Sequence, residues 1–86
     1  MRKAIILVRK ANSETIYDRI HGIVTGHPYE MEHTVFSYFD GKEICAIILE
    51  TKAEVLTELR RWLRAEFSDS AVWMEMTTAG IYPMID

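Results

Sequence analysis

The chain has 86 residues, enough for one small domain, and its 49% hydrophobic and 27% charged residues are the balance of a folded globular protein. Ten Lys and Arg against thirteen Asp and Glu give a net charge of −3. This balance argues against a nucleic-acid binder, because such proteins use a basic excess to contact phosphates. No apolar run approaches the roughly 20 residues of a membrane helix, and the apolar stretch 4–8 is too short for a signal peptide. We therefore expect residues 1–86 to form a single cytoplasmic domain without direct membrane insertion.

The first half of the chain reads as strand, helix and strand. Residues 3–10, KAIILVRK, are a β-branched run of strand length. A helix is predicted to start at residues 12–14 and to end at Gly26 and Pro28. Between these points the apolar residues recur at helical spacing: Ile16, Tyr17, Ile20, Ile23 and Val24. Residues 29–39 alternate and are rich in aromatic and β-branched side chains, which predicts a second strand.

The second half repeats this order. Asp40-Gly41 is a hairpin signal, and residues 43–50, EICAIILE, predict an almost wholly apolar third strand. Thr51 and Glu54 have the spacing of a capping box. The helix that follows has an apolar stripe made of Val55, Leu56, Leu59, Trp62, Leu63 and Phe67. Residues 68–70 interrupt the helix, and Ala71–Thr77 alternates as a last strand.

The predicted order is βαββαβ, which is that of the ferredoxin-like α+β fold. Right-handed crossovers place both helices on one face of a four-stranded antiparallel sheet. In this fold the first and third strands are central and the other two are edges. The two continuous apolar runs fall at the central positions and the charged strands at the edges, which supports the assignment.

The face of the sheet without helices is predicted to be apolar. Either alternate set of residues on each central strand is apolar, so Ile5 and Leu7, or their neighbours, point away from the helices. A monomer rarely exposes several hundred Å² of contiguous apolar surface. We expect a second copy of the chain to cover this face, giving a homo-oligomer such as a homodimer. The other candidate covers are the tail 81–85, another domain and a small-molecule ligand.

Trp73 is the predicted anchor of this interface. If the more uniformly apolar set of the last strand faces the helices, Trp73 points to the open face among polar neighbours. A large aromatic side chain with a polar rim is typical of an interface anchor. The predicted interface residues are therefore Ile5, Leu7 and Trp73, and Trp73→Ala is expected to weaken assembly more than it lowers monomer stability.

No constellation of residues indicates catalysis, and we predict no catalytic residue and no cofactor. The central strands carry no aromatic residue on which an RNA base could stack, which argues against RNA recognition by this fold. A single cysteine is incompatible with the Cys-x-x-Cys loop of a metal chaperone. Cys45 lies in mid-strand without a neighbouring base, so we interpret it as buried and unreactive. The sequence leaves open whether the chain is an enzyme but offers nothing that favours one.

The three histidines suggest an alternative function, which is metal binding. His21, His27 and His33 lie in one stretch with Glu30 and Glu32, and imidazole and carboxylate are ligands of zinc and other transition metals. Their spacing matches no known metal motif, so three surface histidines are the favoured interpretation. The alternative hypothesis is a metal-binding protein or small metal-dependent enzyme using all three. It requires the three ring nitrogens to converge.

Residues 47–82, IILETKAEVLTELRRWLRAEFSDSAVWMEMTTAGIY, resemble the C-terminal soluble domain, of unknown function, of YitT-type bacterial membrane proteins. Asp69, Ala71 and the step Gly80-Ile81-Tyr82 fall where that domain has an Asp-Pro-x-Ala-Phe turn and a closing glycine-aromatic pair. Ser70 replaces the proline of the turn and Val72 its phenylalanine. The glycine-rich lead into the hairpin is absent.

Together with the open apolar face and the lack of catalytic clusters, this resemblance favours a non-enzymatic regulatory or small-ligand-sensing domain that works as a homo-oligomer. It also implies a bacterial origin and a place within a longer membrane protein. The ligand-binding residues predicted on this basis are His33, Tyr38, Asp69, Gly80 and Tyr82. A weaker likeness is to the trimeric divalent-cation-tolerance proteins and the nitrogen-regulatory signalling proteins, which share the fold. The tight Asp40-Gly41 hairpin leaves no room for the long loop of the latter. A third hypothesis is a purely structural interaction module within a longer protein.

Overall fold

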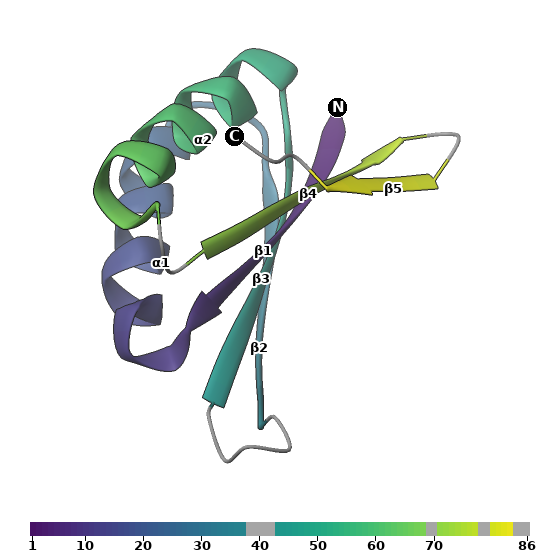
Figure 1. Cartoon of the computed structure of the whole chain (residues 1–86). Coiled ribbons are helices and arrows are strands. Elements are labelled where there is room, and N and C mark those ends of the chain that lie inside the picture. The colour runs from purple at the N-terminus through teal and green to yellow at the C-terminus, as the bar shows by residue number, and fades with distance from the viewer. Residues whose placement is uncertain (38–42, 69–70, 78–79, 84–86) are drawn as a thin grey trace.

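The predicted βαββαβ order is present in the computed structural model, which describes residues 1–37, 43–68, 71–77 and 80–83. The elements are β1 (Arg2–Arg9), α1 (Lys10–Val24), β2 (Glu30–Ser37), β3 (Glu43–Thr51), α2 (Ala53–Phe67), β4 (Ala71–Thr77) and β5 (Gly80–Pro83). Both helices lie on the same side of the sheet (Figure 1), which confirms the ferredoxin-like α+β class. Within the described residues, no helix is long and apolar enough to cross a membrane.

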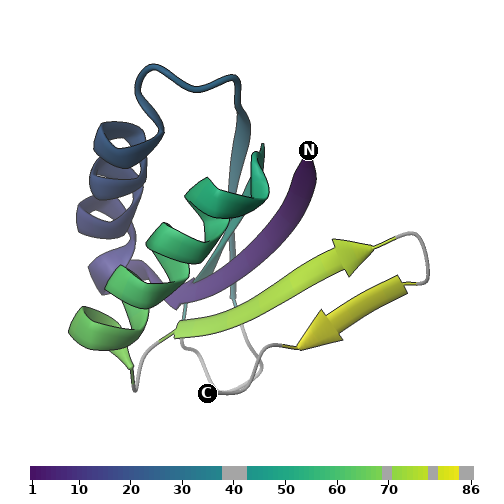
Figure 2. The same ribbon diagram turned by 90° about the horizontal axis from the view of Figure 1, so that it is seen from above.

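The sheet has the strand order β2-β3-β1-β4-β5, and every neighbouring pair is antiparallel. β1 and β3 are central, as predicted. The short strand β5 was not predicted; it pairs along the outer edge of β4 (Figure 2), so β4 is not an edge strand. Residues 81–83 therefore extend the sheet sideways instead of covering its open face. This pairing satisfies backbone groups that an edge strand would leave exposed.

The hydrophobic core lies between the sheet and the helices, and it follows from strand alternation and helical spacing. One alternate set of each central strand is buried, namely Ala4, Ile6 and Val8 of β1 and Cys45, Ile47 and Leu49 of β3. The helices contribute Ile16, Ile20, Val24, Val55, Leu56, Leu59 and Leu63, which are all members of the two predicted stripes. Burying these side chains is the main favourable term in folding. The opposite set of each strand therefore points away from the helices.

The first helix starts earlier than its capping residues suggest. α1 begins at Lys10, and the Ser13 hydroxyl donates a hydrogen bond to the Lys10 carbonyl at 2.8 Å. Ser13 thus bonds within the first turn instead of capping it. The helix ends at Val24, and Gly26 follows with a φ of +89°, a left-handed conformation that glycine adopts without steric cost.

The predicted capping box of the second helix was wrong. α2 begins at Ala53, and Thr51 is the last residue of β3. The buried Thr51 hydroxyl donates a hydrogen bond to the Pro28 carbonyl at 2.9 Å, so it is not available to the helix. This bond ties the end of β3 to the loop between α1 and β2.

Candidate functional site: the open face of the sheet

The sheet register arranges the residues of the open face in rows across the strands. Residues directly opposite each other in an antiparallel pair lie on the same face. The first row holds Glu30, Glu50, Lys3 and Met76, and the second holds Glu32, Ile48, Ile5 and Met74. The third row holds Thr34, Ala46, Leu7 and Val72, and the fourth holds Phe36, Ile44 and Arg9.

The middle of this face is apolar, as the sequence predicted. Its central side chains are Ile5, Leu7, Ile44, Ala46, Ile48 and Met74, all of intermediate exposure, and Phe36, Val72 and Met76 are exposed. Val72, at 52% exposure, is more open to solvent than most apolar strand residues. Exposed apolar surface makes this face a candidate site of interaction. Ile5 and Leu7 lie on this face, and their role in an interface stays a prediction.

The predicted orientation of Trp73 was wrong. Trp73 lies opposite Ile6 of β1, is only 5% exposed, and belongs to the core beneath the helices. Val72, Met74 and Met76 are the residues of β4 that point to the open face. Trp73 is therefore a stability residue of the single chain, and it is not accessible to anchor an interface.

Polar neighbours make the buried position of Trp73 possible. The indole Nε1 donates a hydrogen bond to Glu75 Oε1 at 3.3 Å, and Glu75 also lies 3.7 Å from the Arg2 guanidinium. The indole and the guanidinium thus replace part of the hydration that the Glu75 carboxylate loses when it is partly buried. The prediction assumed that the uniformly apolar set of β4, Val72, Met74 and Met76, faces the helices. The set with Trp73 and Glu75 faces them instead, because the Glu75 carboxylate is paired with Arg2 and the Trp73 indole.

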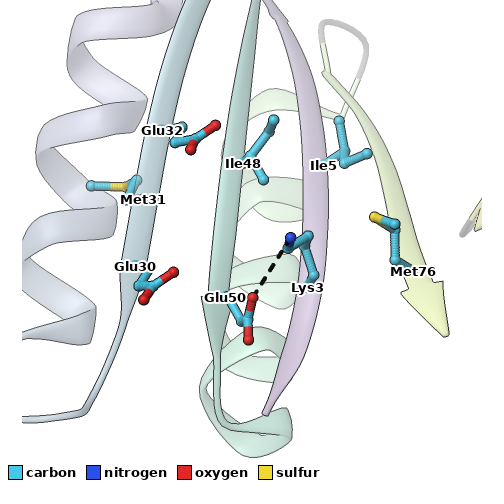
Figure 3. Close-up of a pocket in the computed structure, with 8 residues that line it drawn as sticks. All are labelled: Lys3, Ile5, Glu30, Met31, Glu32, Ile48, Glu50 and Met76. Atoms are coloured by element: carbon cyan, nitrogen blue, oxygen red, sulfur yellow. Dashed lines mark ion pairs between the residues drawn. The ribbon is translucent and has the colours of Figure 1, made fainter. Parts of the chain in front are cut away.

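A pocket of about 170 Å³ occupies the end of the open face where β1 begins. We call it the acidic pocket; its lining residues are Lys3, Ile5, Glu30, Met31, Glu32, Ile48, Glu50 and Met76. Figure 3 shows Glu30 and Glu32 directed over the sheet and Met31 directed the opposite way. Lys3 Nζ lies 3.7 Å from Glu50 Oε2, so one of the three carboxylates has an internal partner. Glu30 and Glu32 form no ion pair with any described residue.

The dimensions of the acidic pocket limit what it can hold. Pockets for drug-sized ligands measure roughly 300–1,000 Å³, well above the 170 Å³ found here. The pocket of a single chain therefore suits one side chain or a comparably small group. Its apolar floor, Ile5 and Ile48, and its excess of carboxylates favour a cationic group on an apolar stem.

The three histidines do not form a metal centre. Among the described residues, no group of three or more His, Cys, Asp or Glu side chains is placed to hold an ion, and all three histidines are described. His21 Nδ1 lies 3.2 Å from the Tyr29 hydroxyl, and the rings of His21 and His33 flank Tyr17 at 4.9 and 5.1 Å. His27 is exposed in the loop after α1. The convergence that the metal hypothesis requires is absent.

The ligand-binding residues implied by the resemblance are not gathered at the acidic pocket. His33 contacts Tyr17 on the helix-facing side of β2. Gly80 and Tyr82 belong to β5 at the far edge of the sheet, opposite Thr77 and Glu75. Tyr38 and Asp69, like the Asp40-Gly41 hairpin, lie outside the described residues. Sequence reasoning did not identify the acidic pocket, because its residues become neighbours only through the register of the strands.

The burial predicted for Cys45 is confirmed. Desolvation by burial raises the pKa of the Cys45 thiol, and a hydrogen bond with Ser13 lowers it by a smaller amount. A thiol with a raised pKa stays protonated near neutral pH and is a poor nucleophile.

Solved structures match this chain at low sequence identity. A PII-like signalling protein from Thermus thermophilus matches with a TM-score of 0.65 and 11% identity, over 98% of this chain and 87% of that one. The de novo designed protein Foldit4 matches with a TM-score of 0.55 and 16% identity, over 90% and 94%. CutA from Synechococcus elongatus matches over 96% and 71% with 12% identity, but its TM-score of 0.43 supports no inference. No protein-family model and no curated protein matches the chain.

These likenesses concern the fold alone. A designed protein and a signalling protein share the same arrangement, which illustrates that a fold hosts unrelated functions.

Proposed function

We propose that this chain is a non-enzymatic regulatory or small-ligand-sensing domain that works as a homo-oligomer assembled through its open face. The observation that carries the proposal is the apolar surface on the side of the sheet without helices, with Val72 at its most exposed point. Burial of apolar surface contributes about 25 cal/mol per Å². A second copy offers the same apolar rows and so is a complementary cover for them.

The fold is compatible with the regulatory part of the proposal, since a signalling protein has it too. The structure with the highest of the three TM-scores is that of a PII-like signalling protein. Among the described residues, no arrangement of side chains favours catalysis or metal binding over a regulatory function. The three histidines do not converge on one point, and Cys45 is buried. We also propose that the chain is related to the YitT-type domain. This relation predicts that homologous chains carry membrane-spanning segments beside this domain, which their sequences would test.

A matched pair of valines on opposite faces tests the assembly. Val72 is 52% exposed on the open face, and Val35 is 42% exposed on the helix-facing side of β2. We expect sedimentation equilibrium at micromolar concentration to give the mass of two or more chains of 10.0 kDa for the wild type and for Val35→Lys. Val72→Lys should shift the mass toward the monomer, because an ammonium in an apolar interface loses its hydration.

Circular dichroism provides the control for folding, since both variants place a lysine at an exposed strand position. A wild-type chain that sediments as a monomer of 10.0 kDa, or equal dissociation by the two variants, would contradict the proposal.

A further inference from the structure

The charges of the open face are divided between its two ends. The acidic pocket brings Glu30, Glu32 and Glu50 to one end, with Lys3 as the only cation among its lining residues. Arg9 lies on the same face at the other end of β1, in the row of Phe36 and Ile44. Lys3 and Arg9 are six positions apart, so about 20 Å of extended strand separates these ends. The apolar rows lie between them.

Three of the charges at the two ends, Glu30, Glu32 and Arg9, lack ion-pair partners within the described part of the chain. Lys3 pairs with Glu50, which leaves Glu30 and Glu32 without a described cation. Arg9 is exposed and forms no ion pair with any residue that the structure describes. One end of the face thus carries a net negative charge and the other a guanidinium, and the two are too far apart to meet within one chain.

We propose that a second copy docks on the open face with its strands running in the opposite direction, so that Arg9 of each copy enters the acidic pocket of the other. This inference rests on the proposed assembly and specifies its orientation. If the two-fold axis runs perpendicular to the strands, the acidic-pocket end of each copy faces the Arg9 end of the other. The pairing of Arg9 with the acidic pocket then occurs twice. If the axis runs parallel to the strands, the acidic pockets of the two copies face each other, and their carboxylates repel.

The acidic pocket matches an arginine side chain in size and chemistry. Its volume of about 170 Å³ suits a single long side chain, and Ile5 and Ile48 offer apolar surface to the methylene stem. Glu30 and Glu32 line the pocket from β2 and extend over the sheet (Figure 3), and carboxylates bind guanidinium groups through paired hydrogen bonds.

A charge-reversal cycle tests the pairing. Arg9→Glu and Glu32→Arg should each raise the dimer dissociation constant roughly tenfold or more, since each places like charges together. The double variant Arg9→Glu/Glu32→Arg should return it to within about fivefold of the wild type, because the pair is restored in reverse. Glu30→Arg with Arg9→Glu is a parallel cycle on the neighbouring carboxylate. The wild-type dissociation constant should also rise with added NaCl, because salt screens the pair.

The control variant is Arg61→Glu, the same charge change at an exposed position of α2; it should leave the dissociation constant within about twofold of the wild type, because charges far from an interface couple weakly to it. Arg9 directly precedes α1 and makes no side-chain cap bond there. A carboxylate near a helix N-terminus is favourable, so Arg9→Glu is expected to fold, and circular dichroism would verify it.

Two outcomes would separate a wrong orientation from a wrong interface. If Val72→Lys dissociates the assembly but neither cycle shows rescue, the arginine pairing is refuted and the open-face assembly stands. If Val72→Lys has no effect, or if the wild type is a monomer, both the assembly and the orientation are refuted.

Discussion

Replacing Trp73 with alanine should destabilise the single chain strongly. Trp73 is 5% exposed within the core, so the change removes a large buried side chain and leaves a cavity. Such Trp→Ala changes cost about 3–5 kcal/mol. A protein of 86 residues has a free energy of unfolding of about 4–13 kcal/mol at 0.05–0.15 kcal/mol per residue. The variant should therefore lose a large share of its stability, and Trp73→Phe, which keeps an aromatic ring but loses the bond to Glu75, should lose about 1–2 kcal/mol.

Urea unfolding followed by circular dichroism measures this loss. The adjacent residue supplies the control, since Val72 lies on the opposite face of the same strand. Val72→Ala should change the free energy of unfolding by less than about 0.5 kcal/mol at a concentration where the chain is monomeric. The loss in the Trp73 variants should be the same at low and high protein concentration, because it arises within one chain. If Trp73→Ala loses less than Val72→Ala, or only at concentrations where the chain associates, the core assignment of Trp73 is refuted.

Two further predictions concern Cys45 and Thr51. The pKa of Cys45 is raised in the folded chain, so the folded state holds a proton that the unfolded state releases as pH rises. The stability difference between the wild type and Cys45→Ala should therefore shrink above about pH 9, where an unfolded thiol ionises; a constant difference from about pH 8 to 10 would contradict this. Thr51→Val should lower the free energy of unfolding by about 1 kcal/mol, because it removes the hydrogen bond to the Pro28 carbonyl. Thr51→Ser keeps the hydroxyl and should retain that bond, and a Thr51→Val variant as stable as the wild type would show that the bond is not needed.

Local sequence determined the two helices and the strands β1 to β4, and their order. The continuous apolar runs of β1 and β3 predicted central strands, because only a strand with neighbours on both sides tolerates so few polar residues. Helical spacing of apolar residues identified α1 and α2, and Gly26 marked the end of the first. These features depend on contacts within a few residues, which a single sequence displays directly. The apolar character of the open face also followed, because both alternate sets of β1 and β3 are apolar.

Tertiary structure decided which way β4 faces and where the chain goes after it. Alternation separates Trp73 and Glu75 from Val72 and Met74, but it does not say which pair lies beneath the helices. That choice depends on residues distant in sequence, because Trp73 packs in the core formed by both helices and the central strands, and Arg2 lies 3.7 Å from Glu75. Residues 80–83, GIYP, contain a glycine and a proline and lack a strand pattern, and they form β5 only because β4 offers a free edge.

The acidic pocket likewise depended on contacts between distant residues. Thr51 bonds to Pro28, 23 positions earlier, and the register brings Glu30, Glu50 and Lys3 into one row. A shift of one residue in any of these three strands would move its side chains to the other face. The candidate site therefore exists only once the strands are paired, whereas the strands themselves can be recognised in the sequence.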